Sequence, residues 1–373
     1  MTPIAKSKPR LHHMDVLKGL AIFMVVMGHV LTMCVRDIDR TVVFKFIGQI
    51  HMPLFFFISG WFTLKLVTDN QGNTQWKIPG LLSRAKRLII PMLFMSTLWV
   101  FYLPHSGLES PLKPTFEGLW FSPWKNGYWF TLVLFEICAV YALTAGIMGR
   151  LRDAYSQIGA TIIVWSILLA VWQLIPVEAD NLLMVSLIAC FYPVFMAGAI
   201  ASAHRKGFER LTESSPAVSI ALIAGACLLY YICWPWEFEA LHLNISTLVV
   251  DVELARTLFQ ILLAFVAIAV VAPWCRKAFA EDAPQSSHRF ARMWEYLGRE
   301  SLTIYLMHYF FLFPMGMWRE TLESLNLGFV PAALFAAFWA AAIIAVVLGV
   351  NFLITPSRLL SFVMAGRLSP KKA

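Results

Sequence analysis

The sequence predicts an all-α fold, a polytopic membrane helix bundle of about ten transmembrane helices, from its composition and from the length of its apolar runs. Of the 373 residues, 59% are hydrophobic and only 14% are charged, whereas a soluble domain has about 45–50% apolar and about 25% charged residues. A soluble chain of this composition would lack the polar side chains needed to cover its surface. We therefore exclude a cytosolic enzyme, a disordered chain and a nucleic-acid-binding module, and we expect membrane lipid around the protein.

The apolar residues form runs long enough to cross a hydrocarbon core, which takes roughly 20 helical residues. Helices are expected because the edges of open strands would be unsatisfied in lipid. The first run follows a basic start, as in a secretory signal, but it is too long and no small-x-small cleavage site follows it. It is therefore taken as an uncleaved span. The ten predicted spans are 16–35, 44–66, 88–104, 128–149, 157–175, 181–203, 216–234, 251–272, 296–318 and 330–354.

No internal repeat, low-complexity tract or long linker divides the chain. We expect one membrane domain over residues 1–373, with basic cytoplasmic tails at residues 1–14 and 355–373. If the N-terminus is cytoplasmic and the spans alternate, 21 of the 30 lysines and arginines lie on the cytoplasmic side and seven on the opposite side. This asymmetry follows the positive-inside rule. It predicts a multi-pass membrane protein with both termini in the cytoplasm.

Ionisable side chains inside spans are costly and mark candidate functional groups. His29 lies about six residues from the outer end of the first span, His51 about seven residues into the second, and Glu136 about eight residues into the fourth. At 1.5 Å rise per residue, all three lie roughly 9–12 Å below the outer surface. We therefore expect a polar chamber that opens outward. Alternatively, each side chain is satisfied by a neighbouring helix, and for His51 the nearby Pro53 frees backbone partners.

His308 lies near mid-membrane in the ninth predicted span, within the segment 304–309. Because its neighbours are aromatic, two interpretations stay open for it. It is either a further catalytic group of the chamber or a hydrogen-bonded packing residue.

Arg84 and Arg87 precede the third span on the cytoplasmic side, and their spacing places them on one helix face. Planar guanidinium groups suit phosphate, and Lys18 at the inner end of the first span would extend this anion site. Ordinary positive-inside charge in contact with lipid headgroups would explain the same residues. The His and carboxylate groups lack the short spacings of a zinc motif, so no metal is expected.

Several motifs resemble those of the family 3 membrane acyltransferases. One motif of the family is an Arg or Lys that is followed, after ten intervening residues, by a His, and Lys18 with His29 fits this spacing. A second motif is Arg-x-x-Arg before the third span, and Arg84 with Arg87 fits it. The resemblance extends along the whole chain. Further agreement lies in residues 51–60, 128–136 and 304–308.

The resemblance implies an enzyme of the bacterial inner membrane. It would move an acyl group, commonly acetyl, from cytoplasmic acyl-CoA (acetyl-CoA) to a hydroxyl of an extracytoplasmic glycan or a similar small-molecule acceptor. Arg84, Arg87 and Lys18 would bind the donor's phosphates. Because His29 lies eleven positions after Lys18, or about 16 Å along the helix, the two must serve opposite mouths of one continuous route.

The resemblance also implies catalytic roles. His29 would act as general base or carry the acyl group, and Glu136 would orient its ring as the third member of a triad does. His51 and His308 are further catalytic candidates. Ser59 and Tyr305 are candidates for stabilising the oxyanion.

Two other classes of protein stay open on the residues alone. A proton-coupled transporter would suit the intramembrane ionisable groups, although the chain shows no repeated halves. A non-catalytic membrane sensor is the other class, and the intact Lys18, His29, Arg84 and Arg87 argue against it. The sequence leaves open the acceptor, the acyl chain and the oligomeric state, a homo-oligomer included.

Overall fold

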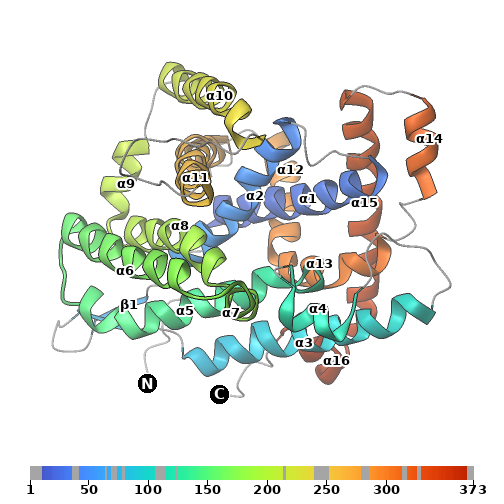
Figure 1. Ribbon diagram of the computed structural model, residues 1–373, viewed down its shortest axis with the longest axis horizontal. Helices are drawn as coiled ribbons and strands as arrows, with labels where there is room; N and C mark the ends of the chain where they lie inside the picture. The colour runs from blue at the N-terminus through green and yellow to red at the C-terminus, as the bar shows by residue number, and fades with distance from the viewer. Residues whose placement is uncertain are drawn as a thin grey trace.

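Long helices form where the apolar runs predict them (Figure 1). A computed structural model of the protein describes residues 11–35, 42–63, 65–68, 74–77, 80–105, 114–122, 124–212, 216–238, 252–278, 285–312, 317–325 and 329–367. The α-helices are α1 (His12–Cys34), α2 (Val42–Trp61), α3 (Leu81–His105), α4 (Phe116–Phe121), α5 (Trp129–Met148), α6 (Ala154–Leu174), α7 (Val177–Leu183), α8 (Val185–Ala203), α9 (Arg205–Thr212), α10 (Pro216–Phe238), α11 (Val252–Ala278), α12 (Gln285–Arg299), α13 (Ser301–Met307), α14 (Arg319–Ser324), α15 (Phe329–Ile354) and α16 (Arg358–Ala365). Two short 3-10 helices are η2 (Lys125–Gly127) and η3 (His308–Phe311).

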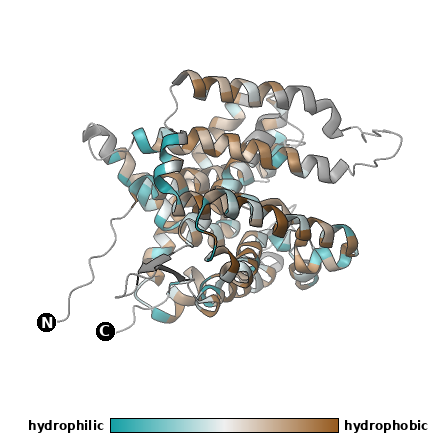
Figure 2. Ribbon diagram, turned by 90° about the vertical axis from the view of Figure 1, so that its left-hand side faces the viewer, coloured by the Kyte–Doolittle hydropathy of each residue, from teal (hydrophilic) through white to brown (hydrophobic). Residues whose placement is uncertain are grey.

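Seven helices within the described residues are long and apolar enough to cross a membrane, which confirms the polytopic helical class. These helices are α1, α3, α5, α6, α8, α11 and α15. Two shorter apolar stretches, Ile50–Trp61 of α2 and Ala217–Leu228 of α10, fall within further predicted spans. Large apolar side chains such as Ile163 on α6 and Phe338 on α15 are exposed, and Figure 2 shows apolar residues along the helices at the periphery. Apolar surface of this extent marks contact with lipid.

Two predicted spans are interrupted. The prediction of one helix over 296–318 is wrong, because α12 ends at Arg299 and α13 then gives way to η3. The break falls at Glu300, whose carboxylate accepts hydrogen bonds from Asn351 of α15 (3.1 Å) and from Arg367. The predicted span 181–203 is divided between α7 and α8 at Met184, which has a positive φ of 54°. A hydropathy pattern contains no information on tertiary contacts or on the backbone angle of a single residue, so it predicts neither interruption.

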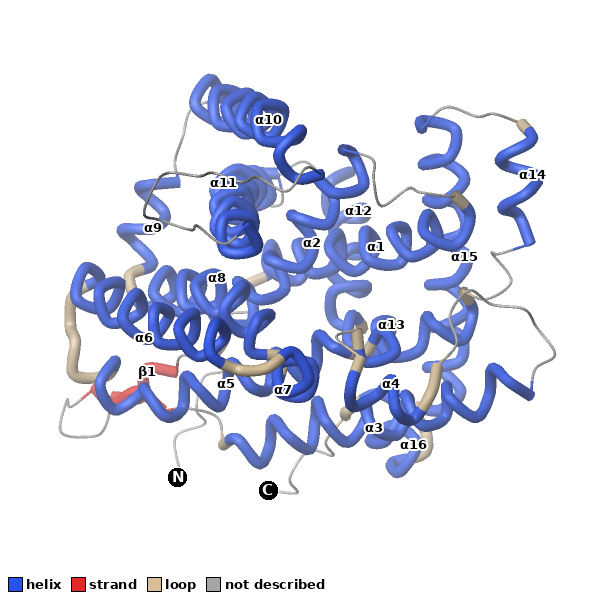
Figure 3. The backbone as a smooth tube through the Cα atoms, in the orientation of Figure 1, coloured by secondary structure: helices blue, strands red, loops and turns tan. Residues whose placement is uncertain are grey.

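The second predicted span, 44–66, ends earlier than expected, at Trp61. A short antiparallel hairpin follows, formed by β1 (Lys65–Thr68) and β2 (Thr74–Lys77), in which Lys65 is opposite Lys77. Figure 3 shows this hairpin in red, between α2 and α3 in the chain.

Helix α1 lies at the centre of the bundle, where it packs against α2, α12 and α15. Two helix crossings are so close that only glycine fits. A Cβ atom on Gly19 of α1 would lie 2.1 Å from the Trp294 carbonyl oxygen, and one on Gly298 of α12 would lie 1.9 Å from the carbonyl oxygen of Asp15. Small residues let membrane helices approach in this way.

The second close crossing joins α2 to α8. A Cβ atom on Gly60 would lie 1.9 Å from the carbonyl oxygen of Phe195, and one on Gly198 would lie 1.9 Å from that of Phe57. Together the two crossings fix α1, α2, α8 and α12, which carry many of the residues described below.

Part of the expected C-terminal tail is helical. Residues 358–365 form α16, which contacts α3 and α13. The hydroxyl of Ser357 caps this helix at the N–H of Leu360, and Gly366 ends it with a φ of 65°. Most of the expected N-terminal tail, residues 1–10, and the end of the C-terminal tail, residues 368–373, lie outside the described residues.

Candidate active site

Two cavities enter the bundle and meet at three residues. One, the basic cavity, has a volume of about 630 Å³ and is lined by Lys18, Arg84, Arg87 and Arg299, among others. The other, the histidine cavity, has a volume of about 660 Å³ and is lined by His29 and His51, among others. Residues that line both are Val25, Met52 and Tyr305. The two cavities are therefore separate chambers whose linings share these three residues, and the expected continuous route between them stays a prediction.

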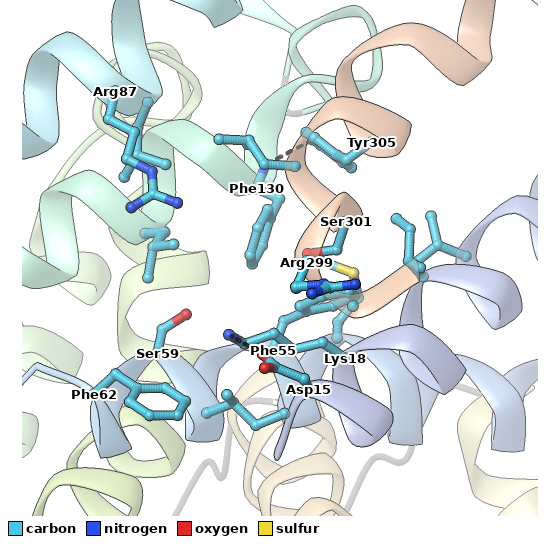
Figure 4. Close-up of a pocket in the computed structure, with 18 of the residues that line it drawn as sticks. Asp15, Lys18, Phe55, Ser59, Phe62, Arg87, Phe130, Arg299, Ser301 and Tyr305 are labelled. Atoms are coloured by element: carbon cyan, nitrogen blue, oxygen red, sulfur yellow. Dashed lines mark hydrogen bonds and ion pairs between the residues drawn. The ribbon is translucent and has the colours of Figure 1, made fainter. Parts of the chain in front are cut away.

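The basic cavity brings together the three cations that the sequence predicted as a phosphate site. The Nζ atom of Lys18, on α1, lies 3.6 Å from Oδ1 of Asp15, one helical turn away. It also lies 4.8 Å from the centre of the Phe62 ring. Figure 4 shows this ion pair on one side of the cavity and Arg87 of α3 across from it. The lining holds four cationic side chains and one carboxylate, so its net charge favours an anion.

Arg84 is held in place by its neighbours in the basic cavity. Its guanidinium donates to the Cys138 sulfur at 2.7 Å and to the Thr63 hydroxyl at 3.1 Å. The Thr63 hydroxyl in turn donates to the Ser59 carbonyl at 2.6 Å. These contacts fix Arg84 against α5 and the end of α2, which reduces the entropy lost when an anion binds.

Arg299, at the end of α12, adds a fourth cation that the sequence prediction did not include. Its guanidinium lies 5.6 Å from the centre of the Tyr296 ring on its own helix. In the sequence Arg299 is only a basic residue at a predicted span end. It enters the cavity because the chain breaks at Glu300, and this break carries no sequence signal.

The histidine cavity contains His29 of α1 and His51 of α2, as predicted. The ring nitrogen Nε2 of His29 lies 3.1 Å from the phenol oxygen of Tyr309. The Nδ1 atom of His51 donates to the carbonyl of Ile47, one turn back on its own helix, at 2.8 Å. The remaining nitrogen of each ring has no recorded partner among the described residues, although both rings line the cavity.

His308 is fully buried, with 0% of its surface exposed, and lies beside His29, with 5.3 Å between the two ring centres. Its Nδ1 atom lies 2.8 Å from the carbonyl of Tyr305 and 3.0 Å from that of Ile304, so this nitrogen carries the proton. Its Nε2 atom is buried and has no partner in the described part of the chain. His308 is thus both packed among aromatic rings and in contact with the candidate base.

The carbonyl of Gly127 organises the aromatic side chains of this region. It accepts hydrogen bonds from the hydroxyls of Tyr305, at 2.8 Å, and Tyr309, at 3.1 Å. The Tyr305 hydroxyl also accepts from the backbone N–H of Phe130 at 3.2 Å, and the Tyr128 hydroxyl donates to the Leu306 carbonyl at 2.9 Å. These bonds join the start of α5 to α13 and η3.

Glu136 of α5 is not brought to His29. It is absent from the lining of both cavities, and the recorded partner of His29 is Tyr309. The charge that acts on Glu136 is that of Lys125. The Lys125 side chain is buried, with only 1% of its surface exposed.

Burial lowers the pKa of the Lys125 amine, and the carboxylates of Glu136 and Asp180 act in the opposite direction. Its Nζ atom donates to the backbone carbonyls of Trp120 and Asn181. Sequence reasoning missed this residue, together with Gly127 and Tyr309. One signal was present, since Asn126-Gly127 is a turn dipeptide.

No group of three or more His, Cys, Asp and Glu side chains that would hold a metal ion occurs among the described residues.

Comparison with known proteins identifies the family. A model of the family 3 acyltransferases, described as an acyltransferase domain, matches residues 11–349. The chain belongs to the family 3 acyltransferases. Family membership makes the protein a membrane acyltransferase, which needs an acyl donor and an acceptor.

The family 3 assignment agrees with a more distant likeness. Nodulation protein NolL of Sinorhizobium fredii is 28% identical over 343 residues, which cover 88% of this chain and 86% of NolL. No solved structure matches the chain.

Proposed function

We propose that this acyltransferase moves an acyl group, acetyl in the simplest case, from acyl-CoA in the basic cavity to a hydroxyl of an acceptor in the histidine cavity. The observation that carries this proposal is the junction of the two cavities at Val25, Met52 and Tyr305. A cationic chamber and an imidazole chamber that share a wall suit a reaction between an anionic donor and a neutral nucleophile.

The basic cavity suits the phosphates of coenzyme A. Arg84 and Arg87 present planar, charged donors that match phosphate oxygens, and Lys18 and Arg299 add positive charge on the opposite wall. Among the described residues, the only carboxylate of the lining is that of Asp15, and it is paired with Lys18. The pantetheine arm would then extend toward the junction and carry the thioester to Tyr305.

The histidine cavity suits an acceptor hydroxyl. A neutral imidazole is a suitable general base near pH 7 because its ordinary pKa is about 6.5. The cavity also has indole walls, from Trp99, Trp124 and Trp129. Such walls pack against the apolar faces of a sugar ring or another hydroxylated molecule.

The transfer balances as a nucleophilic acyl substitution. The acceptor oxygen forms a bond to the thioester carbonyl carbon while His29 takes the hydroxyl proton. The carbon–sulfur bond then breaks, and the proton passes to the departing thiolate to give free coenzyme A and an O-acylated acceptor. A hydroxyl near the junction, such as that of Tyr305 or Ser59, would bind the developing oxyanion.

Orientation follows from charge. The basic cavity is lined by Lys18, Arg84 and Arg87, which the positive-inside rule assigns to the cytoplasmic side, where acyl-CoA would be available, and both termini would share that side. His29 lies eleven residues further along α1, or about 16 Å closer to the other face. We therefore place the protein in a bacterial inner membrane, with the acceptor on the extracytoplasmic side.

Sealed vesicles of both orientations test this function. Radiolabelled acetyl-CoA is added outside inverted vesicles and outside right-side-out vesicles, and the label in envelope glycans and small metabolites is measured. We expect incorporation only with inverted vesicles, and none with the His29→Gln variant at equal expression. Incorporation only with right-side-out vesicles would contradict the assigned orientation, and undiminished incorporation by His29→Gln would remove this residue from the mechanism.

A further inference from the structure

The turn at Lys125–Gly127 has an unusual backbone path. Three successive residues have positive φ angles, 48° at Lys125, 54° at Asn126 and 95° at Gly127. Residues other than glycine rarely adopt this left-handed region. Such conformations persist only where the surroundings hold them, and they concentrate at functional sites.

Side chains of the turn itself hold it in this conformation. The buried ammonium group of Lys125 donates to the carbonyl of Trp120, in α4, and to that of Asn181, in α7. The amide of Asn126 donates to the carbonyl of Thr115 at 2.7 Å. The turn is therefore tied to two other segments through hydrogen bonds that its own side chains supply.

The turn presents one backbone acceptor to the site. The Gly127 carbonyl receives the hydroxyls of Tyr305 and Tyr309. A Cβ atom at position 127 would lie 2.3 Å from Cζ of Tyr309 and 2.5 Å from its hydroxyl oxygen. Glycine is required here both for the backbone angle and for the approach of this ring.

The hydrogens available to Tyr309, Gly127 and His29 determine which ring nitrogen of His29 is protonated. The Tyr309 oxygen lies 3.1 Å from the Gly127 carbonyl and 3.1 Å from Nε2 of His29, but it carries a single hydrogen. The carbonyl has no hydrogen to offer, so the phenol must donate to Gly127. The hydrogen in the second contact must then belong to Nε2 of His29, which leaves Nδ1 as the bare nitrogen of the neutral ring.

We propose that the Lys125–Gly127 turn is a positioning element that fixes the tautomer of His29, so that Nδ1 and not Nε2 is the base. This inference rests on the proposed role of His29 in acyl transfer. Lys125 acts on the reaction through the Gly127 carbonyl and Tyr309, and Asn126, which also lines the histidine cavity, holds the same turn. If the turn loosens, Tyr309 is free to donate its hydroxyl hydrogen to Nε2 of His29 instead. The proton of the neutral ring then lies on Nδ1, which can no longer take the proton of the acceptor hydroxyl.

The experiment measures the tautomer directly, without substrate. Protein with isotope-labelled histidine is placed in lipid bilayers, and the ring-nitrogen chemical shifts are compared with those of His29→Gln to assign the His29 signals. We expect a protonated Nε2 and a bare Nδ1 in the wild type. Lys125→Met and Asn126→Gly should each give a mixture of both tautomers.

Asn126→Gly keeps the test sound if Lys125→Met fails to fold, since glycine adopts a φ of 54° without strain. Its thermal stability should stay close to that of the wild type, while the kcat for acetyl transfer falls at least about tenfold and the KM for acetyl-CoA stays within about twofold. Gly146→Ala, at a helical position with open space around it, is the matched control and should change neither the spectrum nor kcat.

Two results would overturn the inference. One is a wild-type His29 that carries its proton on Nδ1. The other is Asn126→Gly with an unchanged His29 spectrum and unchanged kcat. If instead His29→Gln stays active, the proposed function fails, and the nitrogen spectra still decide separately whether the turn sets the tautomer.

Discussion

The phenol oxygen of Tyr309 lies 3.1 Å from Nε2 of His29, although 280 positions separate the two residues in the chain. This contact joins the central helix α1 to the broken helix near the other end of the protein. The C-terminal end of α1 is held as well, because Arg319 donates to the carbonyls of Thr32 and Met33, both at 3.1 Å. The candidate base is thus fixed from outside its own helix.

The His29–Tyr309 pair yields the first prediction. His29→Gln should lower acetyl transfer at least about a hundredfold, because it removes the base, whereas Tyr309→Phe should lower it about tenfold, because the base remains but loses its partner. Transfer of label from acetyl-CoA in membranes measures both. Tyr155→Phe, at an exposed position, is the control, and Tyr309→Phe with full activity would show that the contact does not matter for catalysis.

Separate roles for the two cavities give a second prediction. Arg84→Gln and Arg87→Gln should each raise the KM for acetyl-CoA about tenfold, because each loses a charged hydrogen bond to phosphate, with little change in kcat. Arg152 is an exposed arginine outside the lining of both cavities, so Arg152→Gln should behave like the wild type. A rise in the KM for the acceptor alone would contradict the assignment of the basic cavity to the donor.

The shared wall gives a third prediction. Met52→Trp adds bulk where the cavities meet, so it should abolish transfer while acetyl-CoA still raises the melting temperature of the purified protein. Leu143→Trp, on an exposed part of α5, controls for the added indole. Full transfer by Met52→Trp would mean that the acyl group does not pass this point.

The helix crossing at Gly60 and Gly198 gives a fourth prediction, on stability. Gly60→Ala and Gly198→Ala should each lower the free energy of unfolding by about 1–3 kcal/mol, because the new methyl group meets backbone that cannot move aside alone. Thermal melting in detergent measures the loss. Gly159→Ala, with nothing within 4 Å of its Cβ position, should melt like the wild type or slightly higher.

A fifth prediction concerns pH and the ion pairs of Glu209, on the short helix α9. The Glu209 carboxylate accepts from Arg205 at 2.7 Å and lies 3.5 Å from Arg276, which joins α9 to α11. The hydrogen bond from Arg205 and the nearby arginine charges lower the pKa of Glu209. Because the folded-state pKa is the lower one, the stability that Glu209 adds is present above its unfolded value of about 4.3 and is lost as the pH falls through the folded value.

The melting temperature of Glu209→Gln should therefore lie below that of the wild type at neutral pH, and the difference should close in acid. A difference that stays constant down to about pH 3 would show that the interaction is not ionic.

The sequence predicts the parts of the site that local spacing determines. Lys18 and His29 follow from one helix and its rise, and Arg84 with Arg87 from one helical turn, so their grouping in two cavities agrees with expectation. Arg299 and Tyr309 lie on either side of Glu300, where the predicted helix is interrupted and where Asn351 and Arg367 donate to the carboxylate. Such contacts between distant segments carry no periodicity, and for this reason the helix break and the tyrosine partner of His29 were not predicted.

The paired glycines also determine which positions are open to redesign. At Gly19, Gly298, Gly60 and Gly198 the obstacle to a larger residue is main chain, so trimming a side chain opposite gives no relief. Directed evolution toward new acceptors should therefore find its beneficial changes on the chamber walls, at residues such as Leu187 and Phe191. The four glycines should stay unchanged through every round of selection.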